Sequence, residues 1–334
     1  MNIGIVNDLP LAVEAMRRAL ALRAEHRVLW VATDGAQAVD FCIAQPPDVV
    51  LMDLIMPKFD GVEATRRIMA RAPCAILVVT SSVGANAWRV YEAMGAGALD
   101  AVDTPTLADN RLADASQPLL AKIDQIGRLL ENPAASQQRP GTLVSQGSAP
   151  LVAIGASAGG PGALAAVLGK LPAYFDAPIV IVQHVDKAFA EGMAQWLDGQ
   201  TALTVRVALG GDEPKPGEAL LAATNDHLHL TRSGTLDYTR EPASTPYRPS
   251  VDVFFHSVVE HWRGDAIGVL LTGMGRDGAI GLKAMRAKGY QTIAQDEATS
   301  AVYGMPKAAA ALDAARLILP LGSIAGELAT LVKR

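Results

Sequence analysis

Residues 49–61 read VVLMDLIMPKFDG and indicate the fold of the first part of the chain. Four apolar residues predict a buried strand, and this strand ends in Asp53. Similar short apolar runs occur at residues 3–6 and 75–80, and amphipathic segments with a helical period separate them. Such an alternation of strands and helices over residues 1–105 predicts a parallel, doubly wound α/β sheet, as in flavodoxin-like folds.

The remainder of the chain predicts a second domain of the same class. Residues 106–149 lack the alternation: Leu119–Leu130 fits a single helix, and the polar stretch after it has the composition of a linker. A new alternation of strands and helices begins at Leu151 and continues to the end. We therefore expect two doubly wound α/β domains, at residues 1–105 and 150–334, joined by a linker at 106–149.

The composition argues against several classes of function. The net charge is −5 and the basic residues form no stripe, so nucleic-acid binding is not expected. The chain has no run of about 18 to 20 apolar residues that could insert into a membrane. Cys42 and Cys74 lack the spacing of metal ligands, and the first residues do not resemble a signal peptide. These features predict a cytoplasmic protein with reduced thiols.

Acidic and hydroxyl side chains follow the strands of the first domain. Asp8 follows the first strand, Asp53 the third, Thr80 ends the fourth and Thr104 follows the fifth. The carboxyl ends of parallel strands meet at one edge of the sheet, where ligands bind. Carboxylates there suit Mg²⁺, and a carboxylate beside Mg²⁺ can accept a phosphoryl group. Alternatively, Asp8 caps the first helix and Asp53 is a solvated strand end.

A glycine-rich turn opens the second domain. Residues 154–162 read IGASAGGPG, which places Ser157 in a G-x-S-x-G pattern between an apolar strand and a helix. This pattern is typical of a sharp turn that exposes a nucleophilic serine, and the N-terminus of the helix suits an oxyanion. A dinucleotide-binding loop would need glycine at position 157. A purely structural turn is the other interpretation.

A serine nucleophile requires a base and an acid that orients the base. His184 follows the apolar strand 179–182, and Asp277 follows the strand 268–271 in a loop rich in glycine. Both are thus expected at the same sheet edge as Ser157, although a core histidine and a helix-capping aspartate are the simpler readings. Among the other histidines, His227 and His229 alternate in a short strand and are expected to be half exposed.

Residues 1–105 resemble response-regulator receiver domains, on the evidence of the loop 53–61. The resemblance implies Mg²⁺ in this domain and a partner histidine kinase that phosphorylates Asp53. It also implies specific positions: Asp8, Asp53 and the Ile55 backbone as metal ligands, and Thr80 and Thr104 as switch residues. Two positions depart from the family: Asn7 replaces an acidic residue and Thr104 replaces a lysine. A phosphoryl group would then meet less positive charge, unless Lys58 supplies it.

The motifs of the second domain, together with the domain order, resemble the CheB family of chemotaxis methylesterases. They are residues 155–160, 183–184, 271–278, 295–298 and 304–306. The resemblance implies that Ser157 is the nucleophile, His184 the general base and Asp277 the group that orients it. It further implies that the backbone N–H of Met274 contributes to an oxyanion hole and that this domain needs no cofactor.

The same resemblance implies a substrate, a glutamate methyl ester on a methyl-accepting receptor, with methanol as a product. Deamidation of glutamine would use the same chemistry, and the unphosphorylated receiver would block the active site. Residues 4–10 are similar to the Wsp-type branch of the family, which serves a surface-sensing pathway that controls cyclic-di-GMP. The residues alone leave two other functions open: a binding module with an inactive hydrolase domain, and a nucleotide-dependent oxidoreductase.

Overall fold

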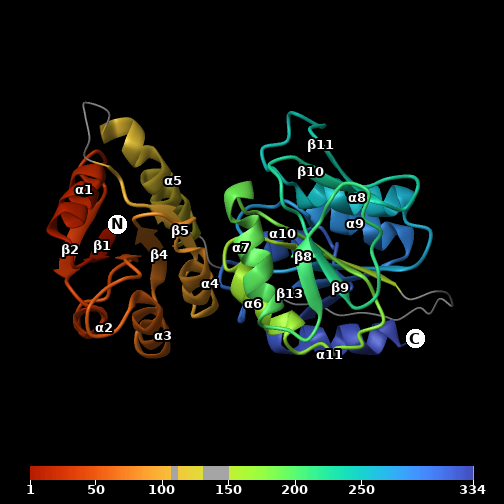
Figure 1. Cartoon of the computed structure of the whole chain (residues 1–334), viewed down its shortest axis with the longest axis horizontal. Coiled ribbons are helices and arrows are strands. Elements are labelled where there is room, and N and C mark those ends of the chain that lie inside the picture. Colours follow the sequence, from red (N-terminus) through yellow and green to blue (C-terminus); the bar gives the residue numbers. More distant parts are fainter. Residues whose placement is uncertain (107–111, 131–149, 334) are drawn as a thin grey trace. The chain divides into compact units, whose positions relative to one another are not determined.

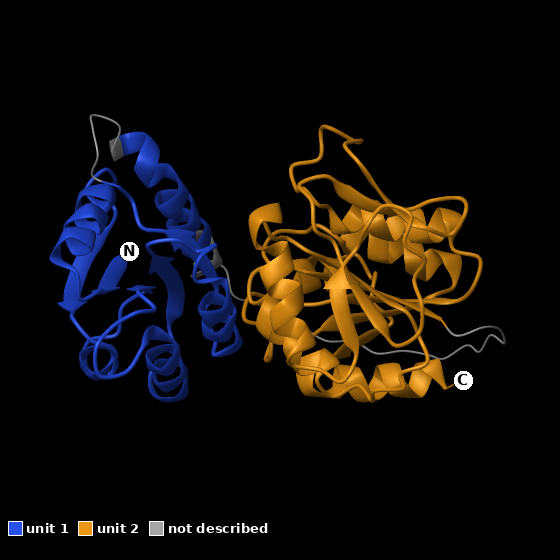
Figure 2. Cartoon of the chain, in the orientation of Figure 1, with its two compact units in different colours: residues 1–135 blue, residues 136–334 orange. Residues whose placement is uncertain are grey.

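The computed structural model describes residues 1–106, 112–130 and 150–333. The chain divides into two compact units, Met1–Ala135 and Ser136–Arg334 (Figure 2). Each unit is built on one parallel sheet, so the predicted fold class is confirmed. In the ranges described, no helix combines the length and the apolar character that crossing a membrane would require.

The first unit contains a five-stranded sheet in the order β2-β1-β3-β4-β5. Its strands are β1 (Asn2–Val6), β2 (Arg27–Ala32), β3 (Val49–Met52), β4 (Ala75–Thr80) and β5 (Asp100–Asp103). Its helices are α1 (Pro10–Leu20), α2 (Gly35–Ala44), α3 (Gly61–Arg71), α4 (Ala87–Gly95) and α5 (Leu112–Leu130). All four residues of the central strand β3 are buried, as expected for a parallel strand with helices on both faces of its sheet.

Helix α5, beyond residue 105, packs in the core of the first unit, within the range where the sequence analysis expected a linker. Helix α5 begins at Leu112 rather than Leu119 and includes Pro118. Its buried apolar side chains belong to the same core as β1, β3 and β4: Leu119, Leu120, Ile123 and Ile126. In the sequence, Pro118 suggests that a helix cannot extend to residues before it. Within α5, however, this proline removes one helical hydrogen bond and the helix continues through it. The expected linker therefore contains a helix of the first unit, and residues 131–149 lie outside the described residues.

The second unit contains a seven-stranded parallel sheet in the order β14-β13-β12-β6-β7-β9-β8 and an antiparallel pair, β10-β11. The sheet strands are β6 (Leu151–Ala156), β7 (Ile179–Gln183), β8 (Thr204–Val207), β9 (Glu218–Leu221), β12 (Ala266–Leu270), β13 (Gln291–Gln295) and β14 (Leu317–Leu319). The pair is β10 (His227–Leu230) and β11 (Leu236–Thr239).

Helices cover both faces of this sheet (Figure 1). They are α6 (Gly160–Leu168), α7 (Lys187–Asp198), α8 (Val251–His261), α9 (Ala279–Lys288), α10 (Met305–Ala311) and α11 (Leu321–Val332). Side chains of α8, α9 and α10 share one core with β6, β7 and β12, including Phe254, Phe255, Leu282 and Met305.

Strand β6 is the position at which the strand order of the second unit reverses. The chain runs from β6 to β7 on one side, and β12 later pairs with the other side of β6. In open parallel sheets, ligands bind at the carboxyl ends of the strands at such a switch point. The fold therefore places the residues that follow β6, β7 and β12 at the favoured position for a site.

Candidate active site

Ser157, His184 and Asp277 lie at the carboxyl ends of three adjacent strands. Ser157 directly follows β6 and His184 directly follows β7, while Asp277 lies in the loop that joins β12 to α9. The backbone holds these ends together: Ser157 N donates to Thr272 O at 3.0 Å, and His184 N donates to Ala156 O at 3.1 Å. The structure thus brings together the three residues that the sequence suggested.

The serine turn has the sharp geometry expected for an exposed nucleophile. Gly159 has a φ of 73°, a left-handed conformation that glycine adopts at no steric cost. A Cβ on Gly160 would lie 2.0 Å from Gln183 Oε1, so this glycine allows the close approach of a neighbouring side chain. The space beside Gly160 is therefore already occupied by the Gln183 side chain. This argues against the interpretation of the turn as a dinucleotide-binding loop.

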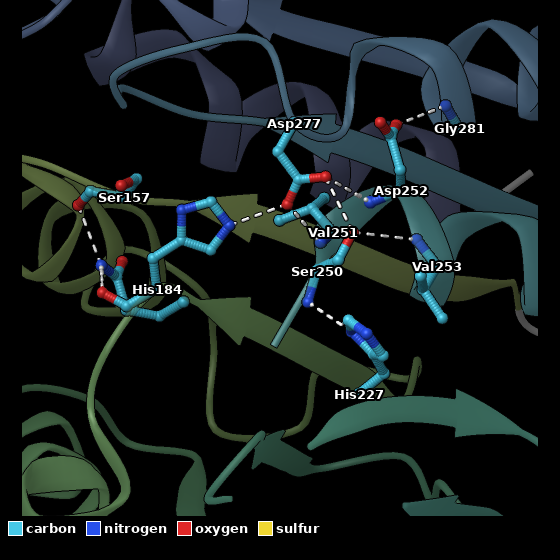
Figure 3. A network of polar contacts seen from close by, with 10 residues as sticks. Ser157, His184, His227, Ser250, Val251, Asp252, Val253, Asp277 and Gly281 are labelled. Carbon is cyan, nitrogen blue, oxygen red and sulfur yellow. Dashed lines mark hydrogen bonds and ion pairs between the residues drawn. The ribbon is translucent and has the colours of Figure 1, made fainter. Parts of the chain in front are cut away.

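Asp277 contacts the imidazole of His184. The Nε2 of His184 lies 2.8 Å from Asp277 Oδ2, and both side chains are largely buried. Because a carboxylate only accepts hydrogen bonds, Nε2 of the neutral ring donates and Nδ1 is left without a proton. Figure 3 shows the imidazole between the other two residues, with Nδ1 directed to the side on which Ser157 lies.

The N-terminus of α8 holds the Asp277 carboxylate. Ser250 Oγ donates to Oδ1 at 2.8 Å, Val251 N donates to Oδ2 at 2.7 Å, and Asp252 N donates to Oδ1 at 3.2 Å (Figure 3). Asp277 thus does not cap α9, whose N-cap is Gly278. Burial alone would raise the pKa of Asp277, but the hydrogen bond and charge of His184, helped by Val251 and Ser250, lower it. The carboxylate is therefore ionised where the imidazole needs it.

His227 is fully buried, whereas the sequence analysis wrongly expected it to be half exposed. Its neighbour Leu228 on the opposite face of β10 is also fully buried, so the alternating pattern could not identify an outer face. Nδ1 of His227 accepts a hydrogen bond from Ser250 N at 3.2 Å. Burial lowers the pKa of His227, which keeps the ring neutral and able to accept this bond.

Gln183 connects the backbones of Ser157 and His184. Its Nε2 donates to Ser157 O at 2.9 Å and to His184 O at 3.2 Å. The sequence analysis assigned no role to Gln183 or Ser250. A polar residue that ends a buried strand is the one signal that could have identified Gln183; Ser250 lies in a separate segment with no such signal.

The loop of Met274 passes directly against Ser157. A Cβ on Gly273 would lie 2.8 Å from Ser157 Cβ, so only glycine lets this loop approach so closely. Gly273 O accepts from Met305 N at 2.8 Å and from Gly304 N at 3.0 Å, which fixes the loop. Among the described residues, the backbone N–H of Met274 donates to no backbone or side-chain acceptor. It is thus available to a ligand oxygen.

The candidate phosphoacceptor edge is formed at the ends of β1, β3, β4 and β5. Asp53 is 8% exposed rather than solvated, and its Oδ1 accepts from Leu54 N at 2.8 Å. Asp8 does not cap α1, whose N-cap is Leu9. Thr80 Oγ1 accepts from Asn86 Nδ2 at 3.0 Å, and Thr104 N donates to Thr80 O at 2.8 Å.

The two carboxylates of this edge fit a divalent cation. Burial raises the pKa of Asp53 to about 6; the N–H groups of Leu54 and Ile55 oppose this rise, and the charge of Asp8 adds to it. A cation with oxygen ligands would relieve the repulsion between Asp8 and Asp53, which is the ligand chemistry of Mg²⁺. Lys58, which the sequence analysis named as a possible source of positive charge, lies 2.5 Å from Asp34 Oδ2 and is already paired.

Comparison with known proteins identifies similar chains for both units. Residues 152–328 match the CheB methylesterase family, and residues 3–116 match the response regulator receiver domain. A protein-glutamate methylesterase/protein-glutamine glutaminase of Burkholderia lata is 77% identical over 334 residues, covering 100% of both chains. A protein of the same name from Burkholderia thailandensis is 73% identical over 336 residues, covering 100% of this chain and 98% of the relative.

A solved structure supports the fold of the second unit. The crystal structure of the Thermotoga maritima CheB methylesterase catalytic domain is 36% identical, with a TM-score of 0.53. The match covers 55% of this chain and 99% of that chain.

Ser250→Ala tests whether the N-terminus of α8 stabilises the Asp277 carboxylate. We expect the hydrolytic rate to fall roughly tenfold, because a hydrogen bond to a charged group contributes about 1.5–3 kcal/mol and the two N–H groups retain part of it. The lost N-cap should also lower the free energy of unfolding by about 1 kcal/mol. Ester hydrolysis and thermal unfolding measure the two effects.

Ser257→Ala is the matched control. Ser257 also lies on α8 and is buried; it donates to Phe254 O and accepts from Leu230 N, away from Asp277. It should lower stability by a similar amount and leave the rate unchanged. An equal loss of activity in both variants would show that the helix matters only for folding.

Proposed function

Since the chain belongs to the CheB methylesterase family and carries an N-terminal receiver domain, we propose that it hydrolyses glutamate methyl esters with Ser157, His184 and Asp277. The observation that carries this assignment is the 2.8 Å contact between His184 Nε2 and Asp277 Oδ2, which leaves Nδ1 free on the side of Ser157. The protein is a protein-glutamate methylesterase that also acts as a protein-glutamine glutaminase.

The reaction begins when His184 Nδ1 takes the proton of Ser157 Oγ as this oxygen attacks the ester carbonyl. The oxyanion that forms is stabilised by the backbone N–H of Met274 and by the positive end of α6. The imidazolium then gives its proton to the leaving oxygen, and methanol departs. Water attacks the resulting acyl-serine with Nδ1 again as the base, which releases glutamate and restores the serine. With glutamine, the leaving group is ammonia.

Asp277 stays ionised throughout. It accepts the Nε2 proton of His184, so it selects the tautomer with a basic Nδ1 and stabilises the imidazolium by charge. The hydrogen bonds from α8 suit this role because they favour the carboxylate over the protonated acid.

The receiver supplies regulation. Asp53 accepts the phosphoryl group of a histidine kinase, and Asp8, Asp53 and the Ile55 carbonyl would hold Mg²⁺. When bound, the cation neutralises charge on the transferring oxygens. Thr80 and Thr104 would sense the phosphoryl group, and the unphosphorylated receiver would restrict access to Ser157. This organisation assigns the receiver to the first compact unit, including α5, and the hydrolase to the second.

The substrate would be a methyl-accepting receptor, reached from the cytoplasm. The family to which the chain belongs and its similarity to enzymes named for glutamate methylesterase and glutaminase activity support this assignment. The residues Gly4–Pro10 support a finer placement in the Wsp-type branch, with a role in a surface-sensing pathway that controls cyclic-di-GMP.

Ser157→Ala tests the nucleophile. The variant should lose about 10⁶-fold in rate, because the base and acid cannot act without the serine oxygen. Release of methanol from a methylated receptor fragment measures the loss, with the exposed Ser233→Ala as the control. If Ser157→Ala keeps more than a tenth of the parent rate, another residue is the nucleophile.

Thr104→Lys tests the switch. A phosphoryl group brings about two negative charges to Asp53, and a lysine bonds it more strongly than a threonine hydroxyl does. The variant should therefore show a larger activation of ester hydrolysis by acetyl phosphate, by up to about tenfold in the ratio of open to closed protein. The measurement compares fold-activation at equal phosphorylation of Asp53, with Asp53→Asn as the unresponsive control. Equal activation of variant and parent would show that Thr104 does not limit the switch.

A further inference from the structure

Tyr247 covers one face of the His184 imidazole. The two rings are stacked with their centroids 4.8 Å apart and their planes only 6° from parallel. Tyr247 belongs to the segment between β11 and α8, far in sequence from the triad, and its side chain is half-buried. No motif of the sequence analysis includes it, and the triad chemistry described above does not use it.

The same side chain also lies against the loop that carries Met274. A Cβ on Gly275 would lie 2.4 Å from Tyr247 Oη, so the absence of a side chain at Gly275 makes room for the tyrosine hydroxyl. Gly275 has a φ of 83° and follows Met274 directly. Tyr247 therefore contacts both the base and the oxyanion loop, and three residues later Ser250 bonds Asp277.

We propose that Tyr247 is a positioning residue for the hydrolytic reaction: its ring fixes the plane of the His184 imidazole, and its π face stabilises the imidazolium that forms in the transition state. The proposal rests on the function proposed above. It does not make Tyr247 a proton donor or a nucleophile, and no bond to it forms or breaks.

The hydrogen bond to Asp277 cannot fix the imidazole by itself. It holds Nε2, whereas the torsion that rotates a histidine ring is broad and has no sharp minimum. A flat ring stacked at 4.8 Å restricts this rotation and keeps Nδ1 directed to one side. Positioning of this kind affects the rate more than it affects substrate binding.

His184 becomes positively charged during the proposed reaction, and the face of an aromatic ring attracts a positive charge. The negative face of a tyrosine ring attracts a cation near it, most strongly where water is partly excluded. The His184 side chain is 14% exposed, so water screens this attraction only in part. The stack therefore stabilises the protonated ring more than the neutral ring.

Other charged groups around the imidazole come from two elements. Asp277, in the loop after β12, accepts from Nε2, and Arg276 beside it borders a pocket of about 570 Å³ that Tyr247 also lines. Asp186, at the start of α7, is bonded to Ala188 N and Asn225 Nδ2. A substitution at Tyr247 leaves these groups in place, so a changed pH profile reports the loss of the aromatic face.

The test compares Tyr247→Leu and Tyr247→Phe in the full chain, with methyl-ester hydrolysis measured from acid to neutral pH. Leucine still covers the imidazole from water but has no π face, whereas phenylalanine keeps the face and loses only the hydroxyl. For Tyr247→Leu we expect a kcat lower by about threefold to thirtyfold, the effect of losing one partly shielded cation–π contact. Its KM should change little. Tyr247→Phe should stay within about twofold of the parent.

The pH profile separates positioning from a structural role. Loss of the π face makes the imidazolium less stable, so the acidic limb of the kcat/KM profile should move to lower pH in Tyr247→Leu. The limb should not move in Tyr247→Phe. Circular dichroism and thermal unfolding establish that both variants are folded.

Several results would overturn the proposal. An unchanged kcat in Tyr247→Leu would remove any role in the reaction, and a raised KM at constant kcat would make Tyr247 a substrate contact. Equal losses in the leucine and phenylalanine variants would assign the effect to the hydroxyl. These results are distinct from failure of the proposed function, in which the parent protein itself releases no methanol.

Discussion

The hydrogen bond between His184 Nε2 and Asp277 Oδ2 is the interaction on which the proposed chemistry of the second unit depends. It connects the end of β7 to the loop after β12, so it crosses β6 and the serine that follows it. Removing either partner would leave a buried polar group without its bond, which is costly in a site so poorly exposed to water. The bond also decides which ring nitrogen can serve as the base.

The surroundings of this bond are organised to preserve the charge of the carboxylate. The first turn of α8 provides two N–H groups and the hydroxyl of its N-cap, Ser250. Behind it, the buried His227 stays neutral and accepts the backbone N–H of Ser250. A helix N-terminus favours negative charge, and here that preference stabilises the Asp277 carboxylate rather than a bound anion. Both units thus place a buried acidic residue, Asp53 or Asp277, at the carboxyl edge of a parallel sheet.

Several residues of the proposed sites could be placed at the sheet edges from the sequence because they directly follow apolar strands. Ser157, His184 and Asp53 each come at the end of such a run, and parallel topology brings strand ends together. Tyr247 and Ser250 could not be found in this way, because an irregular segment reaches the site only through tertiary packing.

The errors in the prediction have similar physical causes. The start of α5 was placed too late because Pro118 reads as a boundary, although the packing of Ile123 and its neighbours in the core outweighs one lost hydrogen bond. The burial of His227 was missed because both faces of β10 are covered, and a two-residue period then carries no information about exposure.

Nitrogen-15 NMR of the histidine rings tests the central claim most directly. With His184 assigned by comparison with His184→Gln, the account predicts that at neutral pH the proton of this imidazole resides on Nε2 and that Nδ1 carries none. Replacing Asp277 with Asn should weaken this preference. A ring protonated on Nδ1 in the unmodified protein would contradict the account, because the nitrogen on the side of Ser157 could not then act as a base.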